Sequence, residues 1–179
     1  PAHAKFQPLG ADEMRAGMLF TSGWLDTQIG GKTIPLHDRE FVFNHPSKDA
    51  TTYESPRRAL YLPIIRNHLY DMLEQFDYPD PTMPTGSRNS TVVAPQALIM
   101  LNSPVAMDSA DKLAAKICRA DANDEARVQH VYELLYARPA SSHETARAIA
   151  FVNKHPDREE AWSLLCHTLL AANEFMYLR

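Results

Sequence analysis

The chain has 179 residues, of which 45% are hydrophobic and 22% are charged, a balance typical of one globular domain or two small ones. Its formal net charge of -4 gives no basic footprint for a nucleic acid or an anionic membrane. No apolar run approaches the roughly 20 residues of a membrane-spanning helix, and no signal peptide is recognisable. The start at Pro1 indicates the interior of a longer polypeptide, either cut or processed.

The segment 10–31 predicts the first helix, in a half of the chain, residues 1–94, that is otherwise rich in loops. Acidic residues suit the positive N-terminal end of this helix, and two consecutive glycines end it. The internal glycines, Gly17 and Gly23, either permit close packing or break the helix early, near Thr21. Its expected apolar face consists of Met14, Met18, Leu25 and Ile29, with Leu19 and Trp24 beside them.

Three further short elements are expected in the same half. Residues 39–45 can form a short strand, whereas Pro63 limits the segment 58–66 to an edge strand or an extended chain. Residues 67–76 predict a helix with Asn67 as its cap. The stretch that follows is too rich in proline for regular structure.

From Pro95 to Ala172 the sequence predicts a series of short amphipathic helices joined by tight turns. Ser103, Ser142 and Asp157 are expected to open three of them. We therefore predict a mainly α fold: a bundle of short amphipathic helices with an irregular, loop-rich N-terminal third and at most a few short strands. The chain would be the C-terminal part of one helical domain, with residues 95–179 as its helical half. The expected core consists of Leu98, Leu101, Leu113, Ile117, Val131, Leu134, Leu135, Ile149, Trp162, Leu165 and Leu169.

A polar loop directly before the first of these helices is the leading candidate site. Arg88 can hold a carboxylate, a phosphate or a sugar hydroxyl with its donor fork, and its neighbours add the donors and acceptors that bind polyols. Alternatively, these groups cap helices and satisfy the backbone of a long loop. In either case we expect the loop to be ordered and Arg88 to have a partner. The expected partners are Asn89, Gln96, Asp77 and Asp80. The candidate ligand-binding residues are Arg88, Asn89, Ser90, Thr91 and Gln96.

Metal-binding and redox side chains give weaker signals. Asp77 and Asp80 can bind Ca²⁺ as a carboxylate pair, although acids three residues apart more often make hydrogen bonds within a turn. The 8 histidines are scattered and form no zinc signature. Cys118 and Cys166 are expected to be free thiols in apolar helical surroundings, with a disulfide between them as the less favoured alternative.

Catalytic motifs are missing from the sequence. It contains no nucleophile elbow, no phosphate-binding loop and no Rossmann glycine pattern. It also contains no Cys-x-x-Cys-His, so this chain attaches no c-type haem itself. The sequence alone therefore names no reaction and no cofactor for this chain.

Five stretches, taken together and in order, identify a family resemblance. They are MRAGMLFTSGWLDTQIGG, ESPRRALYLPIIRNHLYDMLEQFDYPDP, TGSRNSTVVAPQALIMLNSP, RVQHVYELLYARPAS and LLAANEFMYLR. The set resembles the planctomycete-specific C-terminal domain of unknown function found in planctomycete cytochrome C domain-containing proteins. The resemblance covers nearly the whole chain, and its longest signature runs from Arg88 to Asn102.

The resemblance implies a large exported protein in which a cytochrome c-like segment precedes this domain. It implies an extracytoplasmic setting, haem c elsewhere in the parent protein, and partners among the missing N-terminal segments or a chain cleaved from them. Three functions stay open: a redox-associated module that completes an oxidoreductase, a carbohydrate- or polymer-binding module, and a structural domain that assembles the larger protein. No catalytic residue carries over, so for this chain we expect a helical binding or assembly domain.

Overall fold

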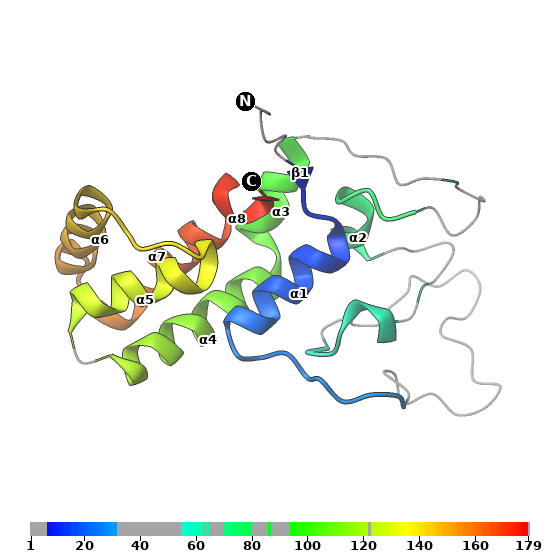
Figure 1. Cartoon of the computed structure of the whole chain (residues 1–179), viewed down its shortest axis with the longest axis horizontal. Coiled ribbons are helices and arrows are strands. Elements are labelled where there is room, and N and C mark those ends of the chain that lie inside the picture. Colours follow the sequence, from blue (N-terminus) through cyan, green and yellow to red (C-terminus); the bar gives the residue numbers. More distant parts are fainter. Residues whose placement is uncertain are drawn as a thin grey trace.

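The computed structural model describes residues 7–31, 55–62, 64, 70–79, 86, 94–121 and 123–178. These residues form a mainly helical fold, and the predicted helical half from Pro95 to Ala172 is confirmed (Figure 1). The helices are α1 (Ala11–Thr21), α2 (Asp71–Gln75), α3 (Ala94–Asn102), α4 (Pro104–Ala120), α5 (Asp124–Tyr136), α6 (Ser142–Lys154), α7 (Arg158–Leu170) and α8 (Asn173–Met176). The remaining elements are the 3₁₀ turn η1 (Ala59–Tyr61) and the strands β1 (Gln7–Pro8) and β2 (Tyr177–Leu178).

Two expected elements of the N-terminal half fall partly or wholly outside the described residues. The strand expected at 39–45 lies outside them, as does Asn67. The helix expected over 67–76 is shorter, because α2 begins at Asp71 with Tyr70 as its N-cap. Within the segment 58–66, where an edge strand or extended chain is expected, Ala59–Tyr61 form the 3₁₀ turn η1, and Pro63 lies outside the described residues.

Polar side chains at the N-caps set the starts of the long helices. Ser103, Asn123, Ser141 and Asp157 each accept a hydrogen bond from a backbone N–H in the first turn of the helix that follows. Each bond satisfies a donor that has no partner inside the helix. For α6 the cap is Ser141 rather than the predicted Ser142, and the Glu144 carboxylate completes a capping box by accepting from the Ser141 N–H.

The cap of α7 gives a direct test of these local signals. The Asp157 side chain accepts from the N–H groups of Glu159 and Glu160 at 2.8 and 3.1 Å. We expect Asp157→Ala to lower the free energy of unfolding by about 1 kcal/mol, measured by urea denaturation. Ser142→Ala, at an exposed position just inside α6, is the matched control and should change it by less than about 0.5 kcal/mol. Equal effects of the two substitutions would show that the cap does not set this helix start.

The core is centred on α4 and α7, which pack together more extensively than any other pair of described helices. α4 contributes Leu113 and Ile117, both fully buried, and α7 contributes Trp162, which is 2% exposed, with Leu165 and Leu169. Figure 1 shows α5 and α6 at one end of the molecule and α1 to α3 at the other, with α4 running between the two ends. The predicted burial of Trp162 is therefore confirmed.

Two side-chain contacts hold α7 against α4 and α3. The Ser163 hydroxyl donates to the Asp111 carboxylate. The ring N–H at Nε2 of His167 donates to the backbone carbonyl of Met100, at 2.9 Å. As the chain advances from Ser163 to His167 on α7, its partners therefore move backwards, from α4 toward the end of α3.

The two cysteines lie on the two helices of this interface, Cys118 on α4 and Cys166 on α7. Both cysteines are free thiols, with Cys166 buried and Cys118 partly buried. The expectation of free thiols is confirmed.

The predicted core was wrong at α3. Leu98 is 58% exposed and Leu101 is 50% exposed, whereas Gln96 and Met100 are buried. α3 is apolar on several sides, so hydrophobicity alone does not show which face meets the protein. Gln96 and Met100 lie four residues apart on α3, and they face α2 and α7, respectively. Leu134 and Ile149 are partly buried and pack against the core.

α1 ends at Thr21 instead of continuing to Gly31, so the early break is the correct alternative. The hydroxyls of Thr21 and Ser22 donate back to carbonyls of the last turn, and Gly23 has a φ of 73° that favours glycine. The close-packing alternative also holds, because a Cβ at Gly17 would lie 3.3 Å from the Phe175 ring. Ile29, expected on the apolar face, is 85% exposed.

Two buried arginines fasten α1 and the segment after it to the segment 55–62. Arg15 in α1 is 1% exposed and donates to the backbone carbonyls of Arg57, at 2.5 Å, and Ser55. Arg57 in turn donates to the carbonyls of Gln28 and Gly30, at 2.8 and 2.5 Å. These bonds satisfy backbone acceptors that belong to no helix or regular sheet.

A two-residue antiparallel pairing joins segments from opposite ends of the described chain. Gln7 pairs with Leu178 and Pro8 with Tyr177. The neighbouring Leu9 N–H donates to the Met176 carbonyl at 2.9 Å. This pairing holds the two ends of the described chain together. Its two short strands agree with the expectation of at most a few short strands.

Candidate functional site

A hollow lies at the junction of α4, α5 and α7. Its volume is about 790 Å³, within the range of small-molecule sites. It lies where the later turns of α4 meet the first turns of α5 and α7, so the N-caps Asn123 and Asp157 position two of its walls. The lining residues are Asp111, Ala114, Ala115, Cys118, Arg119, Arg127, Arg158, Glu159, Glu160, Trp162 and Ser163.

The floor of the hollow is apolar. Ala114 and Ala115 present small side chains from α4, and the buried Trp162 ring forms part of the wall from α7. The Arg127 guanidinium lies 5.8 Å from the centroid of the Trp162 ring, within the range of a cation–π contact. A ligand entering the hollow would therefore meet methyl groups and an aromatic ring below a charged rim.

The rim carries charges of both signs that are partly paired with one another. Asp124 accepts from Arg127 at 3.1 Å and also from Arg158, which additionally donates to the Asn153 side chain at 3.0 Å. Arg127 also donates to the carbonyls of Cys118 and Asp121 at 3.2 and 2.9 Å. The donors of both arginines are thus engaged in joining α4, α5, α6 and α7, and the two arginines hold the shape of the hollow.

Cys118 is the one thiol in the lining. Burial raises the pKa of the Cys118 thiol above its ordinary value, partly offset by the nearby Arg127 guanidinium. A raised pKa keeps the neutral thiol dominant at neutral pH, whereas a nucleophilic cysteine needs a lowered pKa. The electrostatics of the hollow therefore favour binding over nucleophilic chemistry at this residue.

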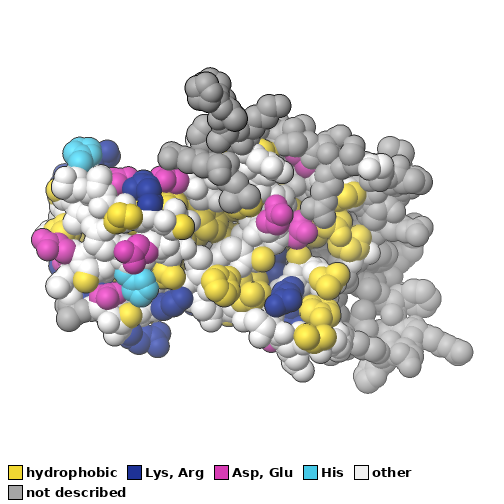
Figure 2. All heavy atoms as spheres, viewed as in Figure 1, with side chains coloured by type: hydrophobic (Ala, Val, Ile, Leu, Met, Phe, Trp, Pro, Cys, Tyr) yellow, Lys and Arg dark blue, Asp and Glu magenta, His cyan; other side chains and the backbone are white. Residues whose placement is uncertain are grey.

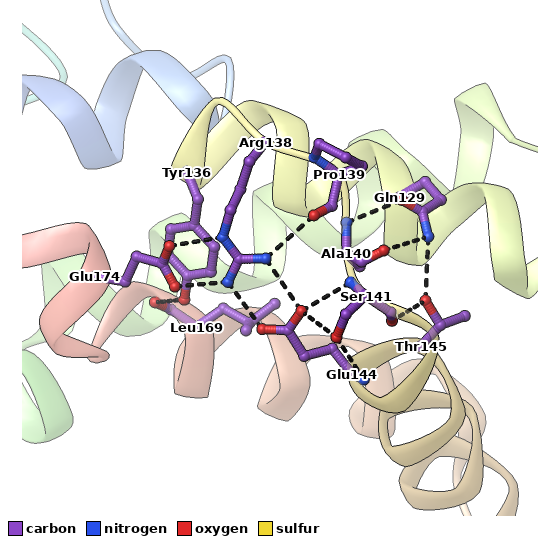
Figure 3. A network of polar contacts seen from close by, with 10 residues as sticks. All are labelled: Gln129, Tyr136, Arg138, Pro139, Ala140, Ser141, Glu144, Thr145, Leu169 and Glu174. Atoms are coloured by element: carbon purple, nitrogen blue, oxygen red, sulfur yellow. Dashed lines mark hydrogen bonds and ion pairs between the residues drawn. The ribbon is translucent and has the colours of Figure 1, made fainter.

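A second polar cluster fastens the turn between α5 and α6 to α8 (Figure 3). Arg138 donates to both carboxylate oxygens of Glu174, at 2.7 Å each, and to both of Glu144, at 2.8 and 3.0 Å. The Tyr136 hydroxyl donates to the Leu169 carbonyl at 2.8 Å beside this cluster. Such two-pronged contacts are the strong form of an ion pair. Because they join Arg138, Glu144 and Glu174 to one another, we interpret the cluster as structural and call it the clasp.

The clasp predicts an acid-sensitive step in stability. Hydrogen bonds from Arg138, and from the Ser141 backbone, lower the pKa of Glu144 from 4.5 to about 2. Because the folded-state pKa is depressed, the stabilisation is present above about pH 4.5 and is lost as the pH falls toward about 2. We expect Glu144→Gln to cost about 1–2 kcal/mol at pH 7, a modest value because both side chains are partly exposed.

The measurement is urea unfolding of the two proteins between pH 7 and pH 2. The gap between the original chain and Glu144→Gln should narrow steadily below about pH 4.5, as the Glu144 carboxylate becomes protonated in both folded and unfolded states. Glu133→Gln, an exposed position on α5, is the control. A gap that stays constant down to pH 2 would contradict the depressed pKa of Glu144.

The predicted polar loop is not among the described residues, so its role stays a prediction. Arg88, Asn89, Ser90 and Thr91 lie outside them. Gln96, in the first turns of α3, is buried, and its side-chain amide donates to the Gln75 carbonyl at 3.0 Å. That bond supports the alternative in which polar groups of this stretch satisfy the backbone, here at the C-terminal end of α2.

The carboxylate pair expected to hold Ca²⁺ is only half described. Asp77 follows α2 with a φ of 55°, a left-handed conformation that aspartate tolerates in turns, and Asp80 lies outside the described residues. Within the described ranges no group of three His, Cys, Asp or Glu side chains is placed to hold a metal ion. The searched helices include none that is long and apolar enough to cross a membrane.

The hollow was missed because its residues come from three helices. Cys118, Arg127 and Trp162 are far apart in the sequence, and each one fits an ordinary helix pattern on its own. Two signals pointed toward the site without identifying it. They are the small residues Ala114 and Ala115 at the end of a helix, and the helix caps that bring the ends of α4, α5 and α7 together.

Comparison with known proteins gives one match. The family model PSD1, described as a protein of unknown function (DUF1553), matches residues 2–152. No curated protein and no solved structure matches the chain. The matched range includes α1 to α5 and most of α6, and therefore two of the three helices that form the hollow.

Proposed function

The chain belongs to the PSD1 family of proteins of unknown function (DUF1553), found in planctomycete cytochrome c-containing proteins, and from this premise we propose that it is a non-catalytic helical binding and assembly domain. In this proposal the domain holds other segments of its parent protein in place. The hollow between α4, α5 and α7 carries the proposal, because a recess with an apolar floor and a charged rim is suited to binding.

The way the described helices are fastened supports a scaffold. Arg15, Arg57 and Arg138 each direct their donors at backbone carbonyls or at carboxylates of another segment. Such contacts fix loops and helix ends without leaving an activated group at a surface. A rigid frame of this kind lowers the entropic cost of binding a partner, because the binding surface is already ordered.

The setting of the proposed function is a redox-associated, exported protein. A cytochrome c-like segment of the same parent would carry the electrons, and this domain would hold that segment or its neighbours. The family context supports this part of the proposal only by association, since a neighbouring domain does not define a site. Chain assembly, rather than electron transfer, is therefore the activity we propose for these residues.

Co-expression tests the proposal. The chain, carrying an affinity tag, is produced in a periplasm together with the preceding segments of the parent protein as a separate untagged chain, and the product is examined by size-exclusion chromatography with light scattering. We expect a stable one-to-one complex with a dissociation constant of micromolar order or lower. The preceding segments expressed with an unrelated helical domain are the control. Two chains that elute separately at micromolar concentrations would contradict an assembly role.

A further inference from the structure

We infer that the hollow receives a large apolar side chain of a partner polypeptide segment in which a basic residue lies beside that side chain. This inference rests on the proposed assembly function and names how the partner is recognised. The floor and the wall supply the apolar surface, from Ala114, Ala115 and the Trp162 ring. A volume of about 790 Å³ has room for one or two bulky side chains, which are the usual anchors of protein interfaces.

The charges of the rim favour a polypeptide over a small anion. Arg127 and Arg158 share the single negative charge of Asp124, and their other donors bind the carbonyls of Cys118 and Asp121 and the Asn153 side chain, so these guanidinium groups are already engaged. The N–H groups at the start of α7 that would attract an anion are occupied by the Asp157 carboxylate. A phosphate or carboxylate ligand would also meet the acidic side chains of the first turn of α7.

Those acidic side chains supply the specificity for a basic residue. Glu159 and Glu160 are exposed in the first turn of α7 and belong to the lining of the hollow. A described contact of the Glu160 carboxylate is with the His155 ring, whose Nε2 lies 4.0 Å away. A Lys or Arg of the partner, placed next to the apolar anchor, would complete an ion pair at the rim while the anchor fills the floor.

Cys118 provides a direct reporter of occupancy. Its thiol lines the hollow, whereas Cys166 is buried in the core and should react slowly under all folded conditions. We expect N-ethylmaleimide to label Cys118 in the isolated chain. In the intact parent protein the labelling rate should fall at least about tenfold, because a tethered partner acts at a millimolar effective concentration. A cysteine introduced by Ala146→Cys at an exposed position on α6 should be labelled equally in both proteins.

Two variants test the two halves of the inference in the complex of separate chains. Ala115→Phe fills the floor, and the double substitution Glu159→Lys with Glu160→Lys reverses the charge of the rim. Each should raise the dissociation constant about tenfold or more, as loss of an anchor pocket or of a desolvated ion pair does. Ala150→Phe, at an exposed site on α6, is the matched control and should leave it unchanged. Circular dichroism melting checks that each variant is folded, and the charge-reversed variant alters only exposed side chains.

The outcomes separate this inference from the proposed function. A complex that forms with Cys118 still fully reactive, or with affinity unchanged in both variants, would overturn the inference and leave the assembly role standing. Failure of the chains to associate at all would overturn both. Protection of Cys118 in the isolated chain that disappears after unfolding, dialysis and refolding would show a small-molecule occupant and would also overturn the inference.

Discussion

Trp162→Ala should destabilise the chain by about 3–5 kcal/mol, the range found when a large buried aromatic side chain is truncated. Trp162 is 2% exposed on the α7 side of the α4–α7 interface, and its ring forms part of the wall of the hollow. Its removal deletes the largest fully buried side chain among the described residues and leaves a cavity that the neighbouring helices cannot easily close, since both ends of α7 are held by hydrogen bonds.

The measurement is the free energy of unfolding from urea titration, followed by circular dichroism because the substitution also removes a fluorophore. Leu164→Ala lies on the same helix at a side chain that is 40% exposed and is the matched control, expected to cost below about 1.5 kcal/mol. If Trp162→Ala lowers the free energy of unfolding no more than Leu164→Ala does, the packing of α7 against α4 is contradicted.

Arg15→Met should be the second most damaging of these substitutions, at about 2–4 kcal/mol. The methionine keeps most of the apolar volume, so the change mainly removes the donors. The carbonyls of Arg57 and Ser55 then lose their partner, and a buried carbonyl without a hydrogen bond costs about 1–3 kcal/mol. Burial already lowers the pKa of the Arg15 guanidinium, with Tyr70 acting in the opposite direction, so the gain from removing a buried charge offsets part of this loss.

Limited proteolysis distinguishes the mechanism from a general loss of packing. If Arg15 fastens the segment 55–62 to α1, that segment should become cleavable at protease concentrations that leave α4 to α7 intact. Arg147→Met, at an exposed position on α6, is the control and should change neither stability nor cleavage. If Arg15→Met leaves the free energy of unfolding unchanged, water replaces the guanidinium at both carbonyls and the prediction is wrong.

The features that could be predicted from the sequence are those set within one or two helical turns. Ser103 and Asp157 are caps because a short polar side chain before an apolar period satisfies free N–H groups. Trp162, Leu165 and Leu169 repeat at helical spacing on one face, so their burial follows from the period alone. The end of α1 was left between two alternatives because Gly17 and Gly23 each have a structural use.

The features that could not be predicted depend on which helix lies opposite which. α3 is apolar on several sides, so only its packing against α2 and α7 shows that Met100 rather than Leu98 or Leu101 is buried. A buried Arg15 is invisible in a sequence, because a charged side chain at an apolar position is normally read as exposed. The hollow depends on the packing of α7 against α4, which no local pattern encodes.

The burial of Cys166 has a consequence for biogenesis. In an oxidising medium the folded domain shields the Cys166 thiol, whereas an unfolded chain exposes it to oxidants and to the thiols of other chains. Both cysteines stay free only if the chain folds before these thiols are oxidised. The yield of native material should therefore increase when a mild reductant is present during refolding and fall when an oxidant is added first.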